Sequence, residues 1–135
     1  MKIVNAAILL GFTLSVGCGG KDALIDEWLE ATEQAQQERL CCGYDMQSCY
    51  AEVALSAAQK DCIRGSFAND PNPESTEAVL RCQTDAAHRM SMCVDNTERE
   101  ICTYDDVACF NKYHDDEDDC PEFFPELQEK LDLCD

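Results

Sequence analysis

The chain has no long hydrophobic run and few basic residues. Its most apolar stretch, "AAILLGFTLSV" (Ala6 to Val16), has eleven residues, whereas about 20 are needed to span a bilayer. Only 10 Lys and Arg stand against 28 Asp and Glu, so the net charge is −18. Nucleic acids and anionic lipid headgroups attract basic surfaces, so both are disfavoured as partners. The acidic balance favours solubility, and it suits cationic partners or divalent ions.

Motifs of several catalytic and metal-binding classes are also missing. The sequence contains no Gly-x-Ser-x-Gly elbow, no phosphate-binding glycine loop and no His-Glu-x-x-His. It also lacks the Cys-x-x-Cys pairs that zinc and thiol redox sites use. If the cysteines are bridged, no thiol nucleophile remains. We therefore predict no enzymatic activity, no cofactor and a structural role for the cysteines.

The first residues are typical of an export signal. Lys2 provides a positive start, the apolar stretch follows, and the small residues Ser15 and Gly17 come next. Two ways of processing this segment are open. Ordinary signal peptidase would accept the small pair and release a soluble secreted chain.

The alternative rests on "SVGCGG" (Ser15 to Gly20), which resembles the lipobox of bacterial lipoproteins: small residues, a Gly and then an obligatory Cys. The resemblance implies that residues 1–17 form the signal peptide and that Cys18 becomes the lipidated first residue. The family usually has Leu three residues before the Cys, where this chain has Ser15. Gly19, in place of an Asp, implies sorting to the outer membrane.

The cysteine count favours the lipoprotein interpretation independently. The chain has 11 cysteines, and lipidation of Cys18 leaves ten, which can all pair. A secreted chain would keep an odd cysteine and would dimerise through it or expose a free thiol. So many paired cysteines indicate a disulfide-stapled domain in an oxidising compartment outside the cytoplasm.

Helical signals dominate the rest of the chain, and no alternating β-branched run indicates a strand. After a tether at residues 18–21, we predict one all-α, cysteine-rich domain over 22–135 with four to five helices. The expected helices start at Asp22, at Asp45 or Ser48, at Pro73, around "DVACFNKY" and within "PEFFPELQEKLDLC".

One pattern occurs twice: "CGYDMQSC" (Cys42 to Cys49) and "CTYDDVAC" (Cys102 to Cys109) share Cys-x-Tyr-Asp-x-x-x-Cys. Each copy is followed by two further cysteines, which favours a duplication of helical hairpins over 22–82 and 83–135. In each copy we expect the Tyr to pack inside and the Asp to cap the next helix. The symmetric disulfide pairing that follows is Cys42–Cys49, Cys102–Cys109, Cys62–Cys82, Cys120–Cys134 and Cys41–Cys93.

Two segments raise the alternative of a metal-binding envelope protein. The acidic run "HDDEDD" (114–119) offers oxygen ligands for calcium, but it lacks the Gly of an EF-hand loop, and such runs are usually solvated. "HRMSMC" (88–93) resembles the Met- and His-rich copper segments of bacterial envelopes, with His88 and Met92 on one helix face. We expect Met90 to fill the core instead. Neither segment predicts a defined metal site.

Together these features predict a monomeric lipoprotein of the cell envelope, anchored in the outer membrane through Cys18 and facing the periplasm or the cell surface. Its domain would be a structural or binding module for an unidentified protein partner. A soluble secreted factor and a divalent-metal or copper-binding envelope protein are the alternatives.

Overall fold

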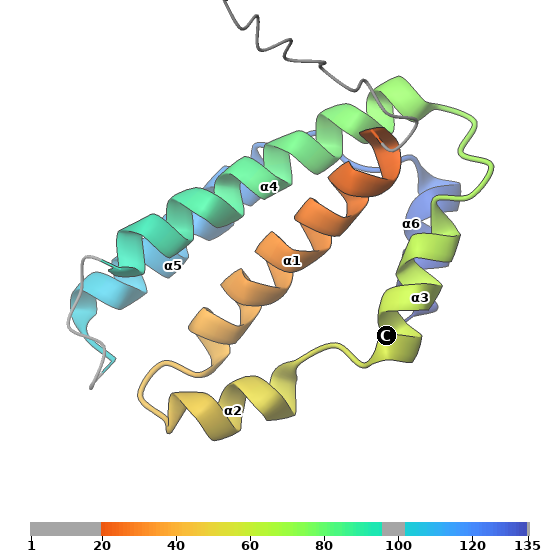
Figure 1. The fold of residues 1–135 in the computed structure, drawn as a ribbon. Coiled ribbons are helices and arrows are strands. Elements are labelled where there is room, and N and C mark those ends of the chain that lie inside the picture. Colours follow the sequence, from red (N-terminus) through yellow and green to blue (C-terminus); the bar gives the residue numbers. More distant parts are fainter. Residues whose placement is uncertain (1–19, 96–101, 135) are drawn as a thin grey trace, which may run out of the picture.

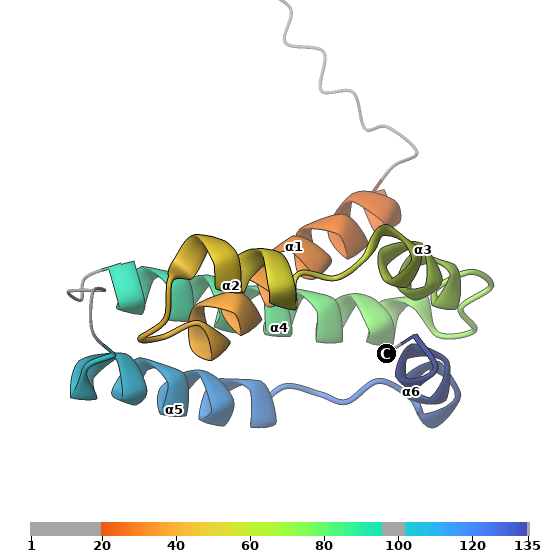
Figure 2. The ribbon, with the colours of Figure 1, turned by 90° about the horizontal axis from the view of Figure 1, so that it is seen from below.

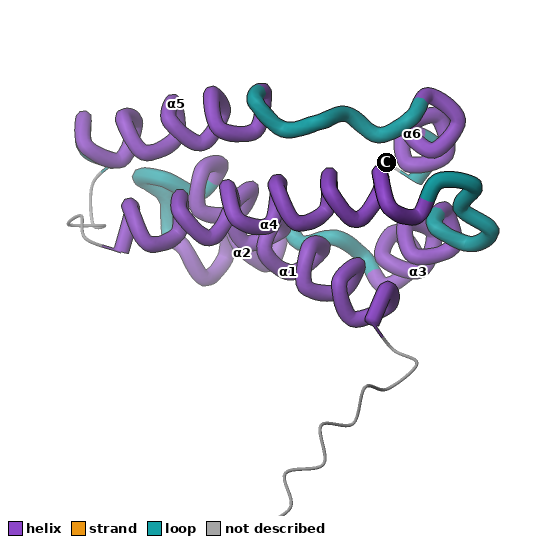
Figure 3. Tube along the Cα trace, turned by 90° about the horizontal axis from the view of Figure 1, so that it is seen from above, coloured by secondary structure: helices purple, strands orange, loops and turns teal. Residues whose placement is uncertain are grey.

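The computed structural model describes residues 20–95 and 102–134, and these form six helices and no strand (Figures 1 and 3). The helices are α1 (Gly20–Leu40), α2 (Met46–Val53), α3 (Ala57–Ser66), α4 (Pro73–Asp95), α5 (Tyr104–Asp118) and α6 (Pro125–Asp132). A small, disulfide-stapled, all-α domain is therefore confirmed. The predicted signal peptide 1–17 and Cys18 lie outside the described residues.

Helix α4 is the centre of the domain, and α1 and α5 both pack along it (Figure 2). Helices α1 and α4 run side by side in the same direction, whereas α5 returns antiparallel to α4 (Figure 1). Helix α2 folds back against α1, and α3 packs against α6. The domain thus contains two antiparallel hairpins, α1–α2 and α4–α5.

One half of the core is aromatic. Trp28 meets Phe67 and Phe123 edge to face, with ring centroids 5.8 and 5.9 Å apart. The indole N–H of Trp28 donates to Gln83 Oε1 at 2.8 Å, which satisfies its polar atom and ties α1 to α4. The buried members of this cluster are Leu24, Ile25, Leu29, Phe67, Val79, Leu80, Phe123 and Leu127.

The other half of the core is built from small residues. Alanines of α1 and α4 face each other here, so the two helices can approach closely: Ala31, Ala35, Ala86 and Ala87. Met90 and Tyr113 complete the cluster, as predicted for Met90, which is 2% exposed. Burial, together with the nearby Glu117 carboxylate, raises the pKa of Tyr113 to about 12.

The second predicted helix is two helices, α2 and α3. Ala54 ends α2 in an extended conformation, and Ser56 begins α3 with a capping box. In that box the Ser56 hydroxyl accepts from the Gln59 N–H, while the Gln59 side chain accepts from the Ser56 N–H. Helix α1 also stabilises the break between α2 and α3, because the Leu55 N–H donates to Glu33 Oε1 at 2.7 Å.

Helix α5 is longer than the short helix predicted around "DVACFNKY" and continues through most of the acidic run. Asp116 explains the extension, because its carboxylate accepts from Lys112 one turn earlier at 2.9 Å and from Arg89 of α4 at 3.1 Å. These two donors hold the pKa of Asp116 below its usual value. The run is thus mainly helical and joined to α4 by one carboxylate.

Candidate functional site

All ten cysteines of the described residues are paired, as the cysteine count predicted, but the predicted partners are wrong. The bridges are Cys41–Cys49, Cys42–Cys102, Cys62–Cys134, Cys82–Cys120 and Cys93–Cys109. None of the pairs predicted above forms: Cys42–Cys49, Cys102–Cys109, Cys62–Cys82, Cys120–Cys134 and Cys41–Cys93.

The adjacent pair Cys41 and Cys42 explains the first errors. Consecutive side chains at a helix end point about 100° apart, so they meet different elements. Cys41 is 0% exposed and bonds Cys49 of α2, whereas Cys42 is half-buried and bonds Cys102, two residues before α5. Cys109 then bonds Cys93 across the α4–α5 hairpin.

The remaining errors follow from the packing of helices distant in sequence. Because α3 lies against α6, Cys62 meets Cys134 at a sequence separation of 72. Because α5 runs antiparallel to α4, the end of α5 brings Cys120 to Cys82. The predicted boundary between residues 82 and 83 also falls inside α4, which is continuous.

The observed pairing nevertheless has a two-fold regularity. The cysteines form two ordered sets of five. The first set is Cys41, Cys42, Cys49, Cys62 and Cys82, and the second set is Cys93, Cys102, Cys109, Cys120 and Cys134. When the sets are exchanged, Cys42–Cys102 maps onto itself, Cys41–Cys49 maps onto Cys93–Cys109, and Cys62–Cys134 maps onto Cys82–Cys120. Equivalent cysteines therefore make equivalent bonds, and the central bond joins the two copies of the repeated motif.

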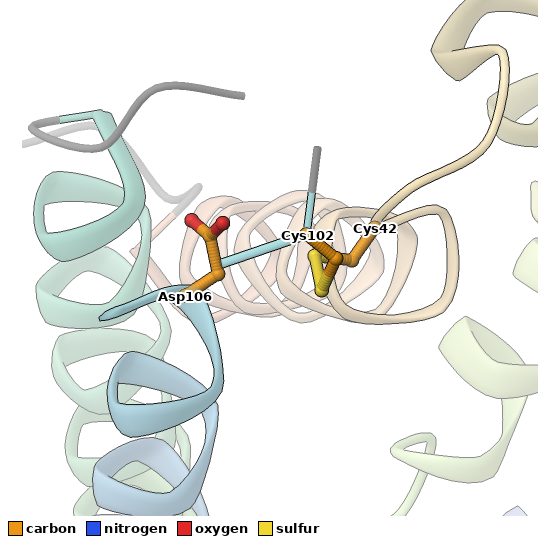
Figure 4. A group of neighbouring side chains, drawn as sticks. All are labelled: Cys42, Cys102 and Asp106. Carbon is orange, nitrogen blue, oxygen red and sulfur yellow. A yellow bond between two sulfur atoms is a disulfide. The ribbon is translucent and has the colours of Figure 1, made fainter. Parts of the chain in front are cut away.

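That central bond lies in the one cluster of three possible metal ligands among residues 20–95 and 102–134: Cys42, Cys102 and Asp106 (Figure 4). Both sulfurs are bonded to each other, so neither is a thiolate. The Asp106 carboxylate accepts from the N–H and hydroxyl of Thr103 at 2.8 and 2.9 Å, as part of a capping box. The disulfide therefore joins the two hairpins, and Asp106 caps the start of α5.

The two segments considered for metal binding lie on the neighbouring helices α4 and α5 and are joined by the Arg89–Asp116 ion pair at 3.1 Å. In the acidic run, His114 and Asp118 are exposed on α5, with His114 Nε2 3.9 Å from Asp118 Oδ2. In "HRMSMC", Met92 is 59% exposed and borders a hollow of about 280 Å³ between α4 and α5, whereas Met90 also lines it but is mostly buried. The described residues of neither segment form a cluster of three His, Cys, Asp or Glu ligands.

Exposed apolar side chains gather around the central bond. Of the six large apolar residues that are exposed in the described ranges, four lie within five positions of Cys42 or Cys102: Leu40, Tyr44, Tyr104 and Val107. We call these four residues and the Cys42–Cys102 bond the tyrosine tip. Both predictions of an inward-packing Tyr are wrong, since Tyr44 is 72% and Tyr104 is 87% exposed.

The local backbone explains why the tyrosines point outward. Gly43 has a φ of 81°, a left-handed conformation that glycine adopts easily, and an added Cβ would lie 3.4 Å from the Cβ of Cys102. The chain thus turns closely around the bridge, which leaves Tyr44 outside the turn. In the other copy the cap is Thr103 instead of the predicted Asp105, so Tyr104 becomes the first residue of α5. No pattern in the sequence indicates this exposed surface directly, although Thr103 and Asp106 form a recognisable capping pair.

Within the described residues, no helix has the length and apolar character needed to cross a membrane. A scan against protein-family models finds no match. Searches of curated proteins and of solved structures also find none.

Proposed function

We propose that the protein is a lipid-anchored binding module of the cell envelope, monomeric and attached to the membrane through Cys18. The observation that carries the proposal is the pairing of all ten cysteines between residues 41 and 134, which leaves Cys18 as the odd one of the 11. That cysteine stands where the lipobox-like segment "SVGCGG" has its acylation site.

The disulfide-stapled helices support a binding role better than a catalytic one. The ten bonded cysteines offer no thiol nucleophile. Five bridges and two packed clusters give a rigid scaffold, on which the tyrosine tip is an exposed apolar surface. Gly19 after the lipidated residue supports the outer membrane as the destination.

Membrane fractionation of the natural host, combined with intact mass spectrometry, tests the anchor. We expect the wild-type protein in the outer-membrane fraction, starting at Cys18 and heavier by its acyl chains. Cys18→Ser should lose the acyl mass and leave the membrane. Ser15→Leu, which introduces the usual lipobox residue in the same segment, should remain anchored and serves as the matched control.

A soluble wild-type protein without acyl mass would overturn the proposal. If that species were also a disulfide-linked dimer, the secreted alternative would hold, because Cys18 would then pair between chains.

A further inference from the structure

The tyrosine tip has a definite geometry. The Cα atoms of Cys42 and Cys102 lie 5.0 Å apart, and each is followed two residues later by its tyrosine. At the reach of two residues on each side, the Cα atoms of Tyr44 and Tyr104 lie within about 20 Å of each other. One covalent bond therefore links the two segments that carry these exposed aromatic rings.

The surroundings of the tip are acidic. Over residues 38–52 and 102–112, two bases, Arg39 and Lys112, stand against five acids: Glu38, Asp45, Glu52, Asp105 and Asp106. Asp106 is buried in its capping box, but Asp45 and Asp105 are exposed, and each directly follows one of the exposed tyrosines. The tip thus presents the same pair, an aromatic face and a carboxylate, twice.

This combination suits guanidinium and ammonium groups. A cation over a tyrosine ring is attracted by the negative face of the ring, most often when the cation is Arg. A neighbouring carboxylate adds charge-assisted hydrogen bonds, which Arg can make in pairs. The aliphatic stems of Arg and Lys would cover Leu40 and Val107, which are 45% and 43% exposed.

We propose that the tyrosine tip binds an Arg-rich segment of a partner protein. The net charge of −18 attracts such a segment from a distance and opposes both a second copy of this chain and an anionic membrane. The proposal deepens the binding role proposed above and does not require the anchor itself.

The position of the tip suits a partner away from the membrane. Helix α1 begins at Gly20, two residues after Cys18 in the sequence, and ends at Leu40 of the tip. Its 21 residues separate the two ends by about 30 Å.

The test is fluorescence anisotropy with a labelled peptide of alternating Arg and Ser, added to the full mature chain with its disulfides intact in non-ionic detergent. Tyr44→Ser combined with Tyr104→Ser leaves the charge unchanged and should weaken binding about tenfold. Tyr44→Phe with Tyr104→Phe keeps both rings and should bind like the wild type. Leu133→Ser, at an 84% exposed apolar residue outside the tip, should also have no effect.

A second pair of variants distinguishes binding at the tyrosine tip from general electrostatic attraction to an acidic protein. The first double variant, Asp45→Asn with Asp105→Asn, removes two negative charges at the tip. The second, Asp118→Asn with Asp119→Asn, removes two negative charges from the acidic run. We expect a clearly larger loss of affinity for the first pair. Equal losses, or an unchanged affinity in the Tyr→Ser variant, would overturn the proposal.

Circular dichroism and the count of five disulfides by mass confirm that each variant is folded. The same titration with the Cys18→Ser chain shows whether binding survives without the anchor. Failure of the lipid attachment and failure of the binding site would therefore be seen separately. Binding to vesicles of anionic lipid, tested alongside, would contradict the choice of a protein partner.

Discussion

The two hairpins, α1–α2 and α4–α5, are built on the same cysteine motif with different turns. In the first, Asp45 is the N-cap of α2 without a side-chain capping bond, and Gly43 makes the turn with a positive φ. In the second, Thr103 and Asp106 form a full capping box. Both hairpins are nevertheless closed by equivalent bridges, and both leave the motif tyrosine exposed.

The difference between the two turns shows that different residues of the motif determine the disulfide bonding and the start of the next helix. The two cysteines set how each copy is bonded, whereas the residues between them select how the next helix begins. A short helix of eight residues follows the weaker start, and one of 15 residues follows the capping box. The stability of each hairpin should therefore depend on different residues, although their bridges correspond.

The largest expected effect is the loss of unfolding free energy when the disulfide between the hairpins is removed, compared with the loss when the disulfide inside the first hairpin is removed. In the chain-entropy model, Cys42–Cys102, at a sequence separation of 60, contributes about 4 kcal/mol, and Cys41–Cys49, at a separation of 8, contributes about 2.5 kcal/mol. Double substitution of each pair by Ala, followed by urea unfolding, should show the greater loss for the bridge between hairpins. An equal or reversed order would mean that the hairpins hold together without their central bond.

The next effect concerns the core of the α4–α5 hairpin. Met90→Ala should lower the free energy of unfolding by about 2–3 kcal/mol, because the side chain is buried beside Ala86 and Tyr113. Met92→Ala is the matched control on the same helix, and its exposed side chain should cost less than about 0.5 kcal/mol. Similar losses for the two variants would contradict the placement of Met90 in the core.

The helix starts can be compared directly. Thr103→Ala removes the capping hydroxyl of α5 and should cost about 1 kcal/mol. Asp45→Ala removes a residue that makes no capping bond in α2 and should cost less than about 0.5 kcal/mol. Thermal unfolding of the two variants measures the difference, and a larger cost for Asp45→Ala would reverse our account of the two turns.

The smallest effect is a pH dependence in the second hairpin. Lys112 and Arg89 lower the pKa of Asp116, so its stabilising contribution is present above the pKa of the unfolded chain and is lost as the pH falls through the lower folded value. Asp116→Asn should therefore be less stable than the wild type at pH 7, and the gap should begin to narrow as the pH falls below about 4, the usual pKa of an Asp carboxyl.

Asp118→Asn serves as the control for this pH dependence, since it removes the same charge from the same helix at an exposed position. Melting temperatures at pH 7 and pH 2.5 measure both variants. A gap between Asp116→Asn and the wild type that stayed constant with pH would show that the ion pairs do not contribute.

Local signals predicted the helices well where they were unambiguous. Pro73 fits the first turn of a helix, and the predicted start at Pro73 agrees with the observed helix Pro73–Asp95. The split between α2 and α3 was missed, because the apolar pattern runs through it. The signal that could have located it is Ser56 with Gln59 three residues later.

The disulfide partners depend on tertiary packing, which local patterns do not contain. Cys62 meets Cys134 because α6 packs on α3, and no periodicity in either segment indicates that contact. The exposure of Tyr104 is a similar case, since its outward direction follows from Thr103 capping α5 beside the bridge. The repeated motif did indicate that the two copies are equivalent, but it could not show that they are bonded to each other.

Disulfide mapping of the non-reduced protein tests the central claim, that one bond joins the two motif copies, most directly. Cleavage by trypsin and on the amino side of aspartate separates Cys42 from Cys49 and Cys102 from Cys109, since Asp45 and Asp106 lie between them. We predict that the peptide containing Cys102 is linked to the peptide containing Cys41 and Cys42. A link from Cys102 to the peptide containing Cys109 would contradict the fold described here and, with it, the tyrosine tip.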